Sequence, residues 1–558
     1  MKHIFKTIAL LILVSLEIAS HAAAANSAME FYNHGIAQQA KGDFNGAIID
    51  YNRAIALDPK NAPAYFNRGY AKQSLKELDG AIADYNRAIE LDPKNAAIYF
   101  NRGNIKQGQG DMDGAIADYN HAIELDPKNA EAYYDRGFAE QTSGDFKSAI
   151  DDYNHTIGLD PKNSHACNNR GELKRSNGDI DGALTDFDNA IAFDPNNAVA
   201  YSNRGIIKKM KGDLEGAVAD YNRAIGIDPR NARAFNNRGS ARQSKGDIDG
   251  AIADYDSAIE FDARLADAYY NRGLTKPDKG DLDGAIADYN QAIELDPKNG
   301  NAYYNRGLAE QDTGDLNAAI GDYNRAIELD PKNAGAYHNR GLAEKTNGDL
   351  GKAMEDYNQA IQLDPNAAVA YFNRGNLKQA NGDLEGAITD FNRSIELNPK
   401  DAQSYNNRGN VQALARRWKE ALADYQHFCE LSESNRDYPR LYIWLIRTRL
   451  GEKEDANKDL ANYLDKRPTA TPGDWYSRLA GRLLGTVTEA DLLSAADSSD
   501  IKIARGQNCE AWFYTGMKTF LDGDRSAAAD DFRKCLATEQ KDFLEFQLAQ
   551  SELKTLGE

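Results

Sequence analysis

Apolar residues recur with helical spacing along most of the chain. The second half of residues 62–95 carries an apolar stripe whose members are separated by 1, 3, 3 and 1 residues: Ala81, Ile82, Tyr85, Ala88 and Ile89. Side chains spaced in this way lie on one side of an α-helix. The first half holds a shorter stripe around Tyr65 and Gly69, so the segment predicts a helix, a turn and a second helix.

Glycine shows that this segment is one of a series. The glycine of an Asn-Arg-Gly triplet, or of a close variant at Gly35 and Gly137, recurs every 34 residues without insertion. Twelve repeats therefore cover residues 28–435, and we number the positions of each repeat 1 to 34. The series comprises Gly35, Gly69, Gly103, Gly137, Gly171, Gly205, Gly239, Gly273, Gly307, Gly341, Gly375 and Gly409.

Other positions of the repeat are nearly as regular. Position 20 is always Ala and position 24 is always Tyr or Phe, while Pro occupies position 32 in all repeats except those with Ala263 and Glu433. This pattern resembles the tetratricopeptide repeat (TPR) over residues 28–435. The resemblance implies an all-α fold, a right-handed superhelical solenoid of antiparallel helix hairpins, whose first helices line a concave groove.

Two positions depart from the usual TPR pattern. Position 7 is Arg in eleven repeats and position 11 is often Lys, Gln or Glu, while position 23 is Asp in all twelve. Positions 7 and 23 are about equally far from the turn of the hairpin. We expect Arg68 and Asp84, with their equivalents, to form a repeated charge-assisted pair. The alternative is two solvated charges that contribute little.

The N-terminus has the layout of a secretory signal peptide. Lys2 and Lys6 precede an apolar run over residues 8–16, which is followed by small residues at 22–25. We expect residues 1–25 to be a signal peptide and the mature chain to be periplasmic or secreted. The alternative, a membrane anchor, requires a longer apolar run than the one that ends before Glu17.

The last 123 residues follow the repeat less closely. Residues 437–470 predict a degenerate TPR repeat, and 471–508 a helical linker with short amphipathic helices around 475–484 and 489–496. Residues 509–558 predict a final repeat and a capping helix over 543–553, because the open end of a solenoid is apolar. This segment resembles envelope TPR lipoproteins of the new lipoprotein I type, although the lipid-bearing cysteine is missing.

Two of the four cysteines are candidates for a disulfide bond. Cys509 and Cys535 occupy positions 1 and 27 of the final repeat, where antiparallel helices bring them together. Export would favour their oxidation, and the alternative is a pair of buried thiols. Cys167 and Cys429 are expected to be packing residues.

The first helices also suggest a binding surface. Position 6 of these helices is asparagine in nearly every repeat, and its carboxamide can both donate to and accept from a peptide group. The resulting ladder of asparagines along the groove is similar to the one in the TPR part of O-GlcNAc transferases. The alternative is that these side chains form only local hydrogen bonds. Asn fills position 6 in every repeat except the one with Asp135, as Asn33, Asn67, Asn101, Asn169, Asn203, Asn237, Asn271, Asn305, Asn339, Asn373 and Asn407.

Position 5 divides the array into zones. It is aromatic in the first four repeats, as Tyr32, Phe66, Phe100 and Tyr134. It is polar in the next three, as Asn168, Ser202 and Asn236, and then continues as Tyr270, Tyr304, His338 and Phe372. If position 5 faces the groove, two adhesive zones flank a polar one. If it faces the next repeat, it serves packing only.

Composition excludes several classes of function. With 66 Lys and Arg against 86 Asp and Glu, the net charge of −20 argues against nucleic-acid binding. The sequence contains no run of 18 apolar residues, so we expect no integral membrane span. The histidines lack metal-ligand spacing, and no nucleotide-binding or nucleophile motif occurs. Asp111 begins a string that suggests calcium, but a helix cap explains it better. We therefore expect no metal and no cofactor.

Pro277 lies at position 12 of repeat 8, inside its first helix. Proline removes a backbone hydrogen bond there, so a kink or a shortened helix is expected near residues 263–280.

Together these features predict a non-enzymatic scaffold or adaptor of the bacterial cell envelope that binds a polypeptide segment in the concave groove. One alternative is a structural solenoid that assembles with itself. A less favoured one is an enzyme with its site in residues 471–558.

Overall fold

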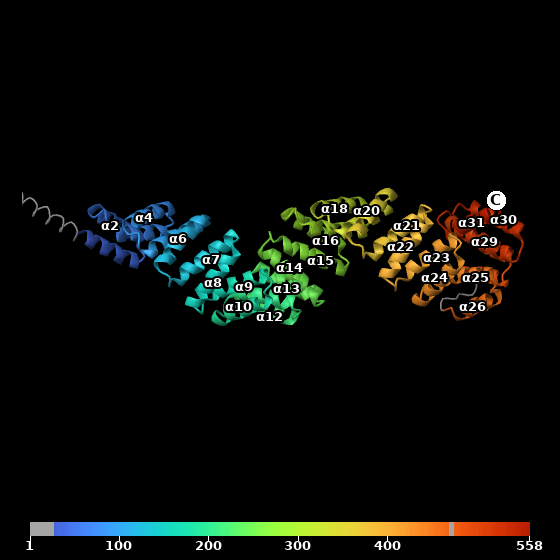
Figure 1. Ribbon diagram of the computed structural model, residues 1–558, viewed down its shortest axis with the longest axis horizontal. Coiled ribbons are helices and arrows are strands. Elements are labelled where there is room, and N and C mark those ends of the chain that lie inside the picture. The colour runs from blue at the N-terminus through green and yellow to red at the C-terminus, as the bar shows by residue number, and fades with distance from the viewer. Residues whose placement is uncertain (1–26, 468–473, 558) are drawn as a thin grey trace, which may run out of the picture. The chain divides into compact units, whose positions relative to one another are not determined.

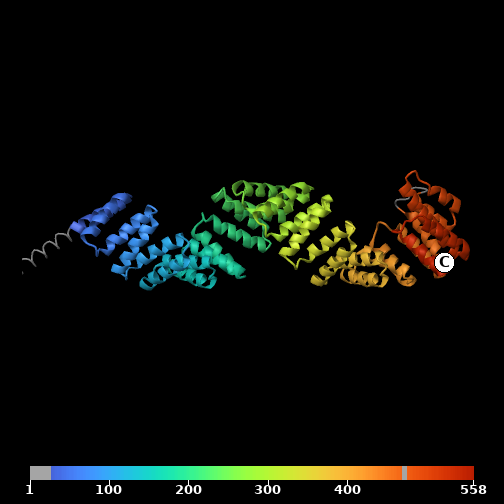
Figure 2. The same cartoon turned by 90° about the horizontal axis from the view of Figure 1, so that it is seen from above.

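The computed structural model describes residues 27–467 and 474–557, which form helices joined by turns, with no strand among them. The predicted signal peptide and the start of the predicted linker lie outside the described residues. Successive helices pair as antiparallel hairpins, and neighbouring repeats stack side by side (Figures 1 and 2). The all-helical repeat fold expected from the sequence is confirmed.

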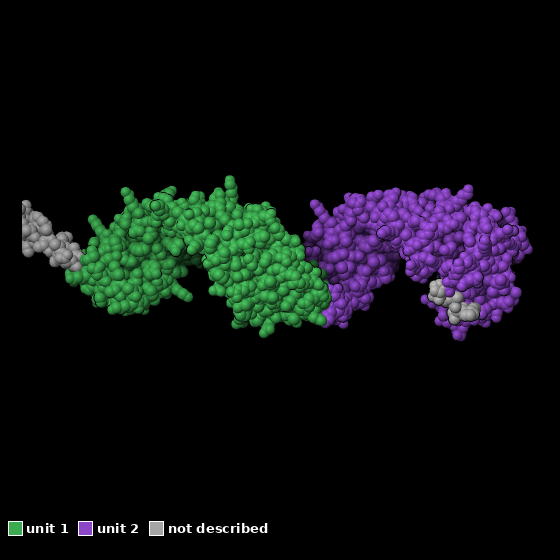
Figure 3. All heavy atoms as spheres, turned by 90° about the horizontal axis from the view of Figure 1, so that it is seen from below, with its two compact units in different colours: residues 1–275 green, residues 276–558 purple. Residues whose placement is uncertain are grey.

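The chain divides into two compact units, residues 1–275 and 276–558 (Figure 3). The first begins with a helix over residues 27–40. It continues with α2 (Phe44–Leu57), α3 (Ala62–Ser74), α4 (Leu78–Leu91), α5 (Ala96–Gly108), α6 (Met112–Leu125), α7 (Ala130–Ser143), α8 (Phe146–Leu159), α9 (Ser164–Ser176), α10 (Ile180–Phe193), α11 (Ala198–Met210), α12 (Leu214–Ile227), α13 (Ala232–Ser244), α14 (Ile248–Phe261) and α15 (Ala266–Thr275).

The second unit completes the array and adds a C-terminal helical segment. It contains the 3-10 helix η1 (Lys276–Lys279), α16 (Leu282–Leu295), α17 (Gly300–Thr313), α18 (Leu316–Leu329), α19 (Ala334–Thr346), α20 (Leu350–Leu363), α21 (Ala368–Ala380), α22 (Leu384–Leu397), α23 (Ala402–Leu414), α24 (Trp418–Leu431), α25 (Asp437–Arg449), α26 (Lys453–Lys466), α27 (Trp475–Leu484), α28 (Glu489–Ala495), α29 (Ile501–Leu521), α30 (Arg525–Ala537) and α31 (Leu544–Leu556).

Each hairpin is built from local signals. In repeat 3, Gly110 has φ +85° and turns the chain between α5 and α6. Asp111 then caps α6 by accepting a hydrogen bond from the Gly114 amide at 3.0 Å, as the helix-cap interpretation requires. A Cβ at Gly103 would lie 2.8 Å from the Tyr119 ring. Position 8 therefore needs glycine because the aromatic of position 24 packs directly against it.

Repeat 8 has the shortened helix that its proline predicts. The α-helix α15 ends at Thr275 after 10 residues, and the 3-10 helix η1, which contains Pro277, follows it. The first helices of the other repeats, from α3 to α23, have 13 or 14 residues. The missing proline N–H removes one α-helical bond and favours the tighter 3-10 turn.

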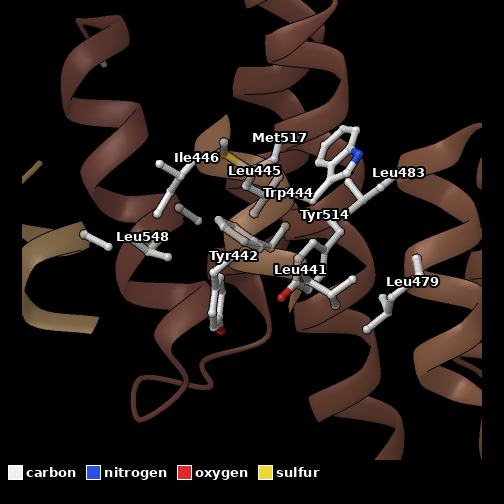
Figure 4. Close-up of a cluster of buried hydrophobic side chains, with 14 of the residues drawn as sticks. Leu441, Tyr442, Trp444, Leu445, Ile446, Leu479, Leu483, Tyr514, Met517 and Leu548 are labelled. Atoms are coloured by element: carbon white, nitrogen blue, oxygen red, sulfur yellow. The ribbon is translucent and has the colours of Figure 1, made fainter. Parts of the chain in front are cut away.

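The C-terminal segment packs around one continuous core with repeat 12. Helix α29 begins at Ile501, inside the predicted linker, because Asp500 caps it by accepting from the amide of Lys502 at 2.8 Å. Figure 4 shows side chains of α25, α27, α29 and α31 meeting in this core: Leu441, Tyr442, Trp444, Leu445, Ile446, Leu479, Leu483, Tyr514, Met517 and Leu548.

The last helix returns to the repeat array. Helix α31 contacts α23 as well as α29 and α30. Glu552 of α31 is buried and accepts from Arg449 at 2.6 Å and from Arg416 at 3.1 Å. The capping helix thus covers both the final repeat and the end of repeat 12.

No helix among the described residues is both long and apolar enough to cross a bilayer.

Candidate functional site

The predicted pair of positions 7 and 23 is present. Arg68 donates from Nε to one oxygen of Asp84 at 2.9 Å and from Nη2 to the other at 2.5 Å. The Asp84 side chain is only 5% exposed, so this is a buried bidentate pair. Arg68 also donates to Asn52 of the preceding repeat at 2.6 Å and lies over the Tyr65 ring. One guanidinium therefore joins both helices of its hairpin to the neighbouring hairpin.

The same bidentate pair recurs along the array, with His34 and Asp50 in its place in repeat 1 at 2.6 Å. It joins Arg102 to Asp118, Arg136 to Asp152, Arg170 to Asp186, Arg204 to Asp220, Arg238 to Asp254, Arg306 to Asp322, Arg340 to Asp356, Arg374 to Asp390 and Arg408 to Asp424.

Positions 2, 6, 9 and 13 of the first helix of each repeat form one stripe, which we call the A face. Their spacing of 4, 3 and 4 residues places them on one side of the helix. Seven large apolar side chains on this stripe are 40% to 60% exposed: Met29, Ile36, Tyr70, Phe138, Val199, Met210 and Val369. In the space-filling view each unit is indented along its lower edge (Figure 3).

The asparagines of position 6 lie on the A face and are mostly half-buried. In six of them the amide nitrogen is used within the protein, because it donates to the position-5 side chain of the preceding repeat. These bonds run from Asn67 to Tyr32 at 2.9 Å, Asn169 to Tyr134 at 3.3 Å, Asn203 to Asn168 at 3.0 Å, Asn271 to Asn236 at 3.0 Å, Asn339 to Tyr304 at 2.9 Å and Asn373 to His338 at 3.0 Å.

Other asparagines of the ladder donate to different acceptors. Asn101 follows Phe66, which has no acceptor, and donates instead to the Ala97 carbonyl at 2.8 Å. Asn305 also donates to a backbone carbonyl, that of Asn301, at 2.8 Å. Asn407 follows Phe372 and donates to Asn376 at 2.8 Å. Asn33 is exposed.

Asp135 is the carboxylate in the ladder. The position-5 residue of the preceding repeat is Phe100, which has no hydrogen-bonding group. The bond between positions 6 and 5 that joins other repeats therefore cannot form here. Burial, together with the nearby Glu131, raises the pKa of Asp135 to about 6.

Position 5 lies at the boundary between repeats. The Tyr32 ring packs beside the Tyr51 ring of its own hairpin at 6.1 Å, and its hydroxyl accepts from the next repeat. Phe66, Phe100, Tyr134, Tyr304, His338 and Phe372 also pack beside the position-24 ring, at 5.8 to 6.0 Å. Position 5 thus has a packing role in these repeats, and its part in binding stays a prediction.

The sequence reasoning missed the apolar residues at positions 2, 9 and 13. A seven-residue spacing from position 2 to position 9, with the asparagine of position 6 between them, could have identified the stripe. The apolar zone that position 5 suggested in repeats 1 to 4 is extended there by Ile36, Tyr70 and Phe138, which are each about 40% exposed.

Position 11 modifies the buried aspartate of position 23. In repeat 2 it is Lys72, whose ammonium lies 2.8 Å from Asp84. In repeats 4, 9 and 10 it is Glu140, Glu310 and Glu344, and burial together with the neighbouring aspartate raises the pKa of each to about 7. These three repeats therefore hold carboxyl groups that titrate near neutral pH.

The C-terminal core contains two buried carboxyl groups. Burial and the charge of Glu545 raise the pKa of Glu510 to about 7, and burial also raises the pKa of Glu545. Glu510 accepts from the Tyr438 hydroxyl at 3.0 Å and from Trp475. Glu545 accepts from the Tyr442 hydroxyl at 2.5 Å. Both carboxyls thus bind side chains of the core itself.

A hollow of about 300 Å³ lies where the A face of repeat 12 meets this segment. Amide groups dominate its lining on the repeat side, and Tyr438 and Tyr442 line the other side. The lining consists of Gln403, Asn406, Asn410, Phe428, Asn435, Tyr438, Pro439, Tyr442 and Leu544.

Cys509 and Cys535 are brought together as their positions predicted, with the two Sγ atoms 3.4 Å apart. Both are buried free thiols in this structure, so the disulfide stays a prediction. Cys167 and Cys429 are also buried, in the core positions expected of packing residues. Among the described residues, no group of three His, Cys, Asp or Glu side chains could hold a metal ion.

Comparison with known proteins identifies the repeat. A profile described as TPR repeat matches residues 39–76, 74–110, 108–144, 171–212, 209–246, 239–276, 278–314, 309–348 and 344–382. Tetratricopeptide repeat profiles also match 130–163, 368–401 and 391–423. A comparison with curated protein sequences finds no match.

Several solved structures are similar to parts of the chain. MamA is 31% identical, with 30% of this chain and 96% of MamA covered and a TM-score of 0.28. YrrB, described as a TPR protein with an unusual peptide-binding site, is 24% identical, with 33% and 95% covered and a TM-score of 0.30. The Cut9–Hcn1 hetero-tetramer of APC/C is 14% identical, with 77% and 98% covered and a TM-score of 0.39.

Proteins built from this repeat typically bind other proteins or peptides on the surfaces of stacked hairpins, and they are usually non-catalytic. The profile matches cover more than half of the residues, and the hairpin geometry agrees with them. The chain belongs to the tetratricopeptide repeat family.

Proposed function

We propose that this protein is a scaffold or adaptor of the bacterial cell envelope that holds a segment of a partner polypeptide along the A face. The N-terminal pattern of residues 1–25 supports export to the periplasm or beyond. The resemblance of the C-terminal segment to envelope TPR lipoproteins supports the same location.

The observation that carries the proposal is the concentration of exposed apolar side chains on the A face. Tyr70, Phe138 and Val199 are each at least 40% exposed, although nearby core positions bury their side chains completely. Apolar surface that repeats along one face of a soluble array gains free energy when a partner covers it.

The asparagine ladder supplies polar contacts between these apolar side chains. The carboxamide oxygens of Asn67 and Asn203 accept no hydrogen bond within the part of the chain that the structure describes. Each can therefore accept from a peptide N–H while its nitrogen holds the neighbouring repeat. A surface of this kind suits an extended chain, because it recognises the peptide group rather than one side chain.

The test is a crosslinking capture from the envelope fraction of the source bacterium with the full chain as bait. Tyr70→Ser with Phe138→Ser removes apolar A-face contacts. Asn33→Ala with Asn237→Ala removes ladder amides for which the structure shows no bond to another repeat, so the stack stays intact. We expect both pairs to reduce capture of the same partner.

A matched control separates binding from folding. Exposed apolar residues of the second helices, replaced as Ile49→Ser with Phe146→Ser, should leave capture unchanged, since they lie outside the A face. Equal capture by the A-face variants and the parent chain would overturn the proposal.

The alternative of self-assembly predicts a different result. Light scattering after size exclusion would then show a mass that rises with protein concentration, and the A-face substitutions would return the chain to the monomer mass.

A further inference from the structure

Position 12 of the first helix carries a structural glutamine in most repeats. The hydroxyl of the position-24 tyrosine donates to it, as Tyr85 does to Gln73 at 2.7 Å and Tyr323 to Gln311 at 3.0 Å. The glutamine thus completes the hydrogen bonding of a buried tyrosine. It occurs as Gln39, Gln73, Gln107, Gln141, Gln243, Gln311 and Gln379.

The adjacent repeats 5 and 6 carry the cations Arg175 and Lys209 at this position, and repeat 10 carries Lys345. In repeat 5 the aromatic of position 24 is Phe187, which has no hydroxyl to satisfy. The Arg175 Nε is buried without a hydrogen-bond partner. The Lys209 ammonium reaches into the next repeat and donates to the Ser240 hydroxyl on the A face. In the described part of the chain, no carboxylate lies within 4 Å of either cation.

Half-buried cations without a counter-ion are costly, and burial lowers the pKa of Lys209. Their surroundings do not offset this cost. On the A face of repeats 5 to 7 the acidic side chain is Glu172, one helical turn before Arg175, while Arg233 adds a third, exposed cation. This stretch is therefore positive in a chain whose net charge is −20.

We propose that Arg175 and Lys209 form the binding site for an acidic residue, Asp or Glu, of the partner polypeptide. This inference rests on the proposed function and assigns the middle repeats a sequence preference. A carboxylate that reaches either cation would receive a charge-assisted hydrogen bond from it. Repeats 1 to 4, where Tyr70 and Phe138 are exposed, would hold the apolar residues on one side of it.

The experiment selects peptides from a random 16-residue display library on the immobilised full chain. The recovered peptides are synthesised with a fluorescein label and measured by anisotropy. We expect them to contain an Asp or Glu, and expect its replacement by Asn or Gln to weaken binding about tenfold, as for loss of one charge-assisted bond. The effect should shrink as salt rises.

The decisive variant is Arg175→Gln with Lys209→Gln. Glutamine is the residue that seven of the twelve repeats carry at position 12, so the hairpins should be preserved. This variant should bind acidic and amidated peptides equally. The control, Arg223→Gln with Arg230→Gln, removes the same charge from exposed sites outside the A face and should keep the tenfold preference.

The possible failures are distinct. If peptides bind without an acidic preference, or if the decisive variant keeps that preference, the inference about Arg175 and Lys209 is wrong and A-face binding stands. If no peptide is recovered, or if Tyr70→Ser with Phe138→Ser leaves binding unchanged, both the inference and the proposed function are overturned.

Discussion

Arg340 donates two parallel hydrogen bonds to Asp356, with Nε 2.8 Å from one carboxylate oxygen and Nη2 2.6 Å from the other. In this repeat position 11 is Glu344, so the aspartate lacks the second cation that Lys72 gives to Asp84. The two repeats thus hold the same buried carboxylate with different support.

This difference predicts unequal effects of one substitution. Arg340→Gln should cost about 3–5 kcal/mol, because it leaves a buried carboxylate beside another acidic group. Arg68→Gln should cost about 1–3 kcal/mol, because Lys72 remains. Denaturant unfolding would measure the total, and hydrogen exchange would place the loss in repeat 10 or repeat 2. Equal losses would show that Lys72 contributes nothing.

Stability should fall as pH rises through neutrality. The folded-state pKa of Glu140, Glu310 and Glu344 is about 7, above the ordinary value of 4.5. The folded state therefore binds these protons more tightly. The resulting stabilisation is complete below pH 4.5 and is lost as pH rises through 7, at on the order of 1–3 kcal/mol per group.

Glutamine at the three sites should remove this dependence, since repeats 1 and 12 carry Gln38 and Gln412 at position 11. Urea unfolding at pH 5.5 and pH 8 would show the variant close to the parent at the lower pH and more stable at the higher. The exposed triple variant Glu90→Gln, Glu124→Gln and Glu396→Gln is the control. A parent chain with equal stability at both pH values would contradict the prediction.

The turn of repeat 2 can be improved. Lys76 occupies position 15 with φ +64°, where ten repeats have glycine. A side chain in this conformation is strained, so Lys76→Gly should stabilise the chain by about 0.5–1 kcal/mol. At Asn381, where φ is −84°, glycine should instead destabilise by about 0.5–1 kcal/mol. Thermal unfolding of the two variants would distinguish them by the sign of the Tm change.

The state of Cys509 and Cys535 should report the compartment. If the chain is exported as proposed, the two thiols, 3.4 Å apart, should be oxidised to one disulfide. Alkylation under denaturing conditions and mass spectrometry should then count two free thiols, Cys167 and Cys429, in exported protein. Protein made without residues 1–25 in the cytoplasm should show four. Four free thiols in the exported chain would refute the prediction.

Much of the fold could be predicted from single positions of the repeat. Gly103 and Tyr119 are coupled within one hairpin, and the pairing of Arg68 with Asp84 follows from their equal distance from the turn. Such contacts are separated by 16 residues, and one hairpin geometry determines them. The A-face apolar residues were missed because position 9 varies among repeats and no single residue type marks it.

What the sequence alone determined is the hairpin and its period, because helix spacing, caps and turn glycines act within one repeat. The tertiary structure decided which hydrogen bonds the recurring side chains form between repeats. The amide nitrogen of Asn67 donates to the hydroxyl of Tyr32 in another hairpin, which no local pattern reveals. Likewise α31 packs on α23, with Glu552 bound to Arg416 across 136 residues, because the apolar surface at the end of the array must be covered.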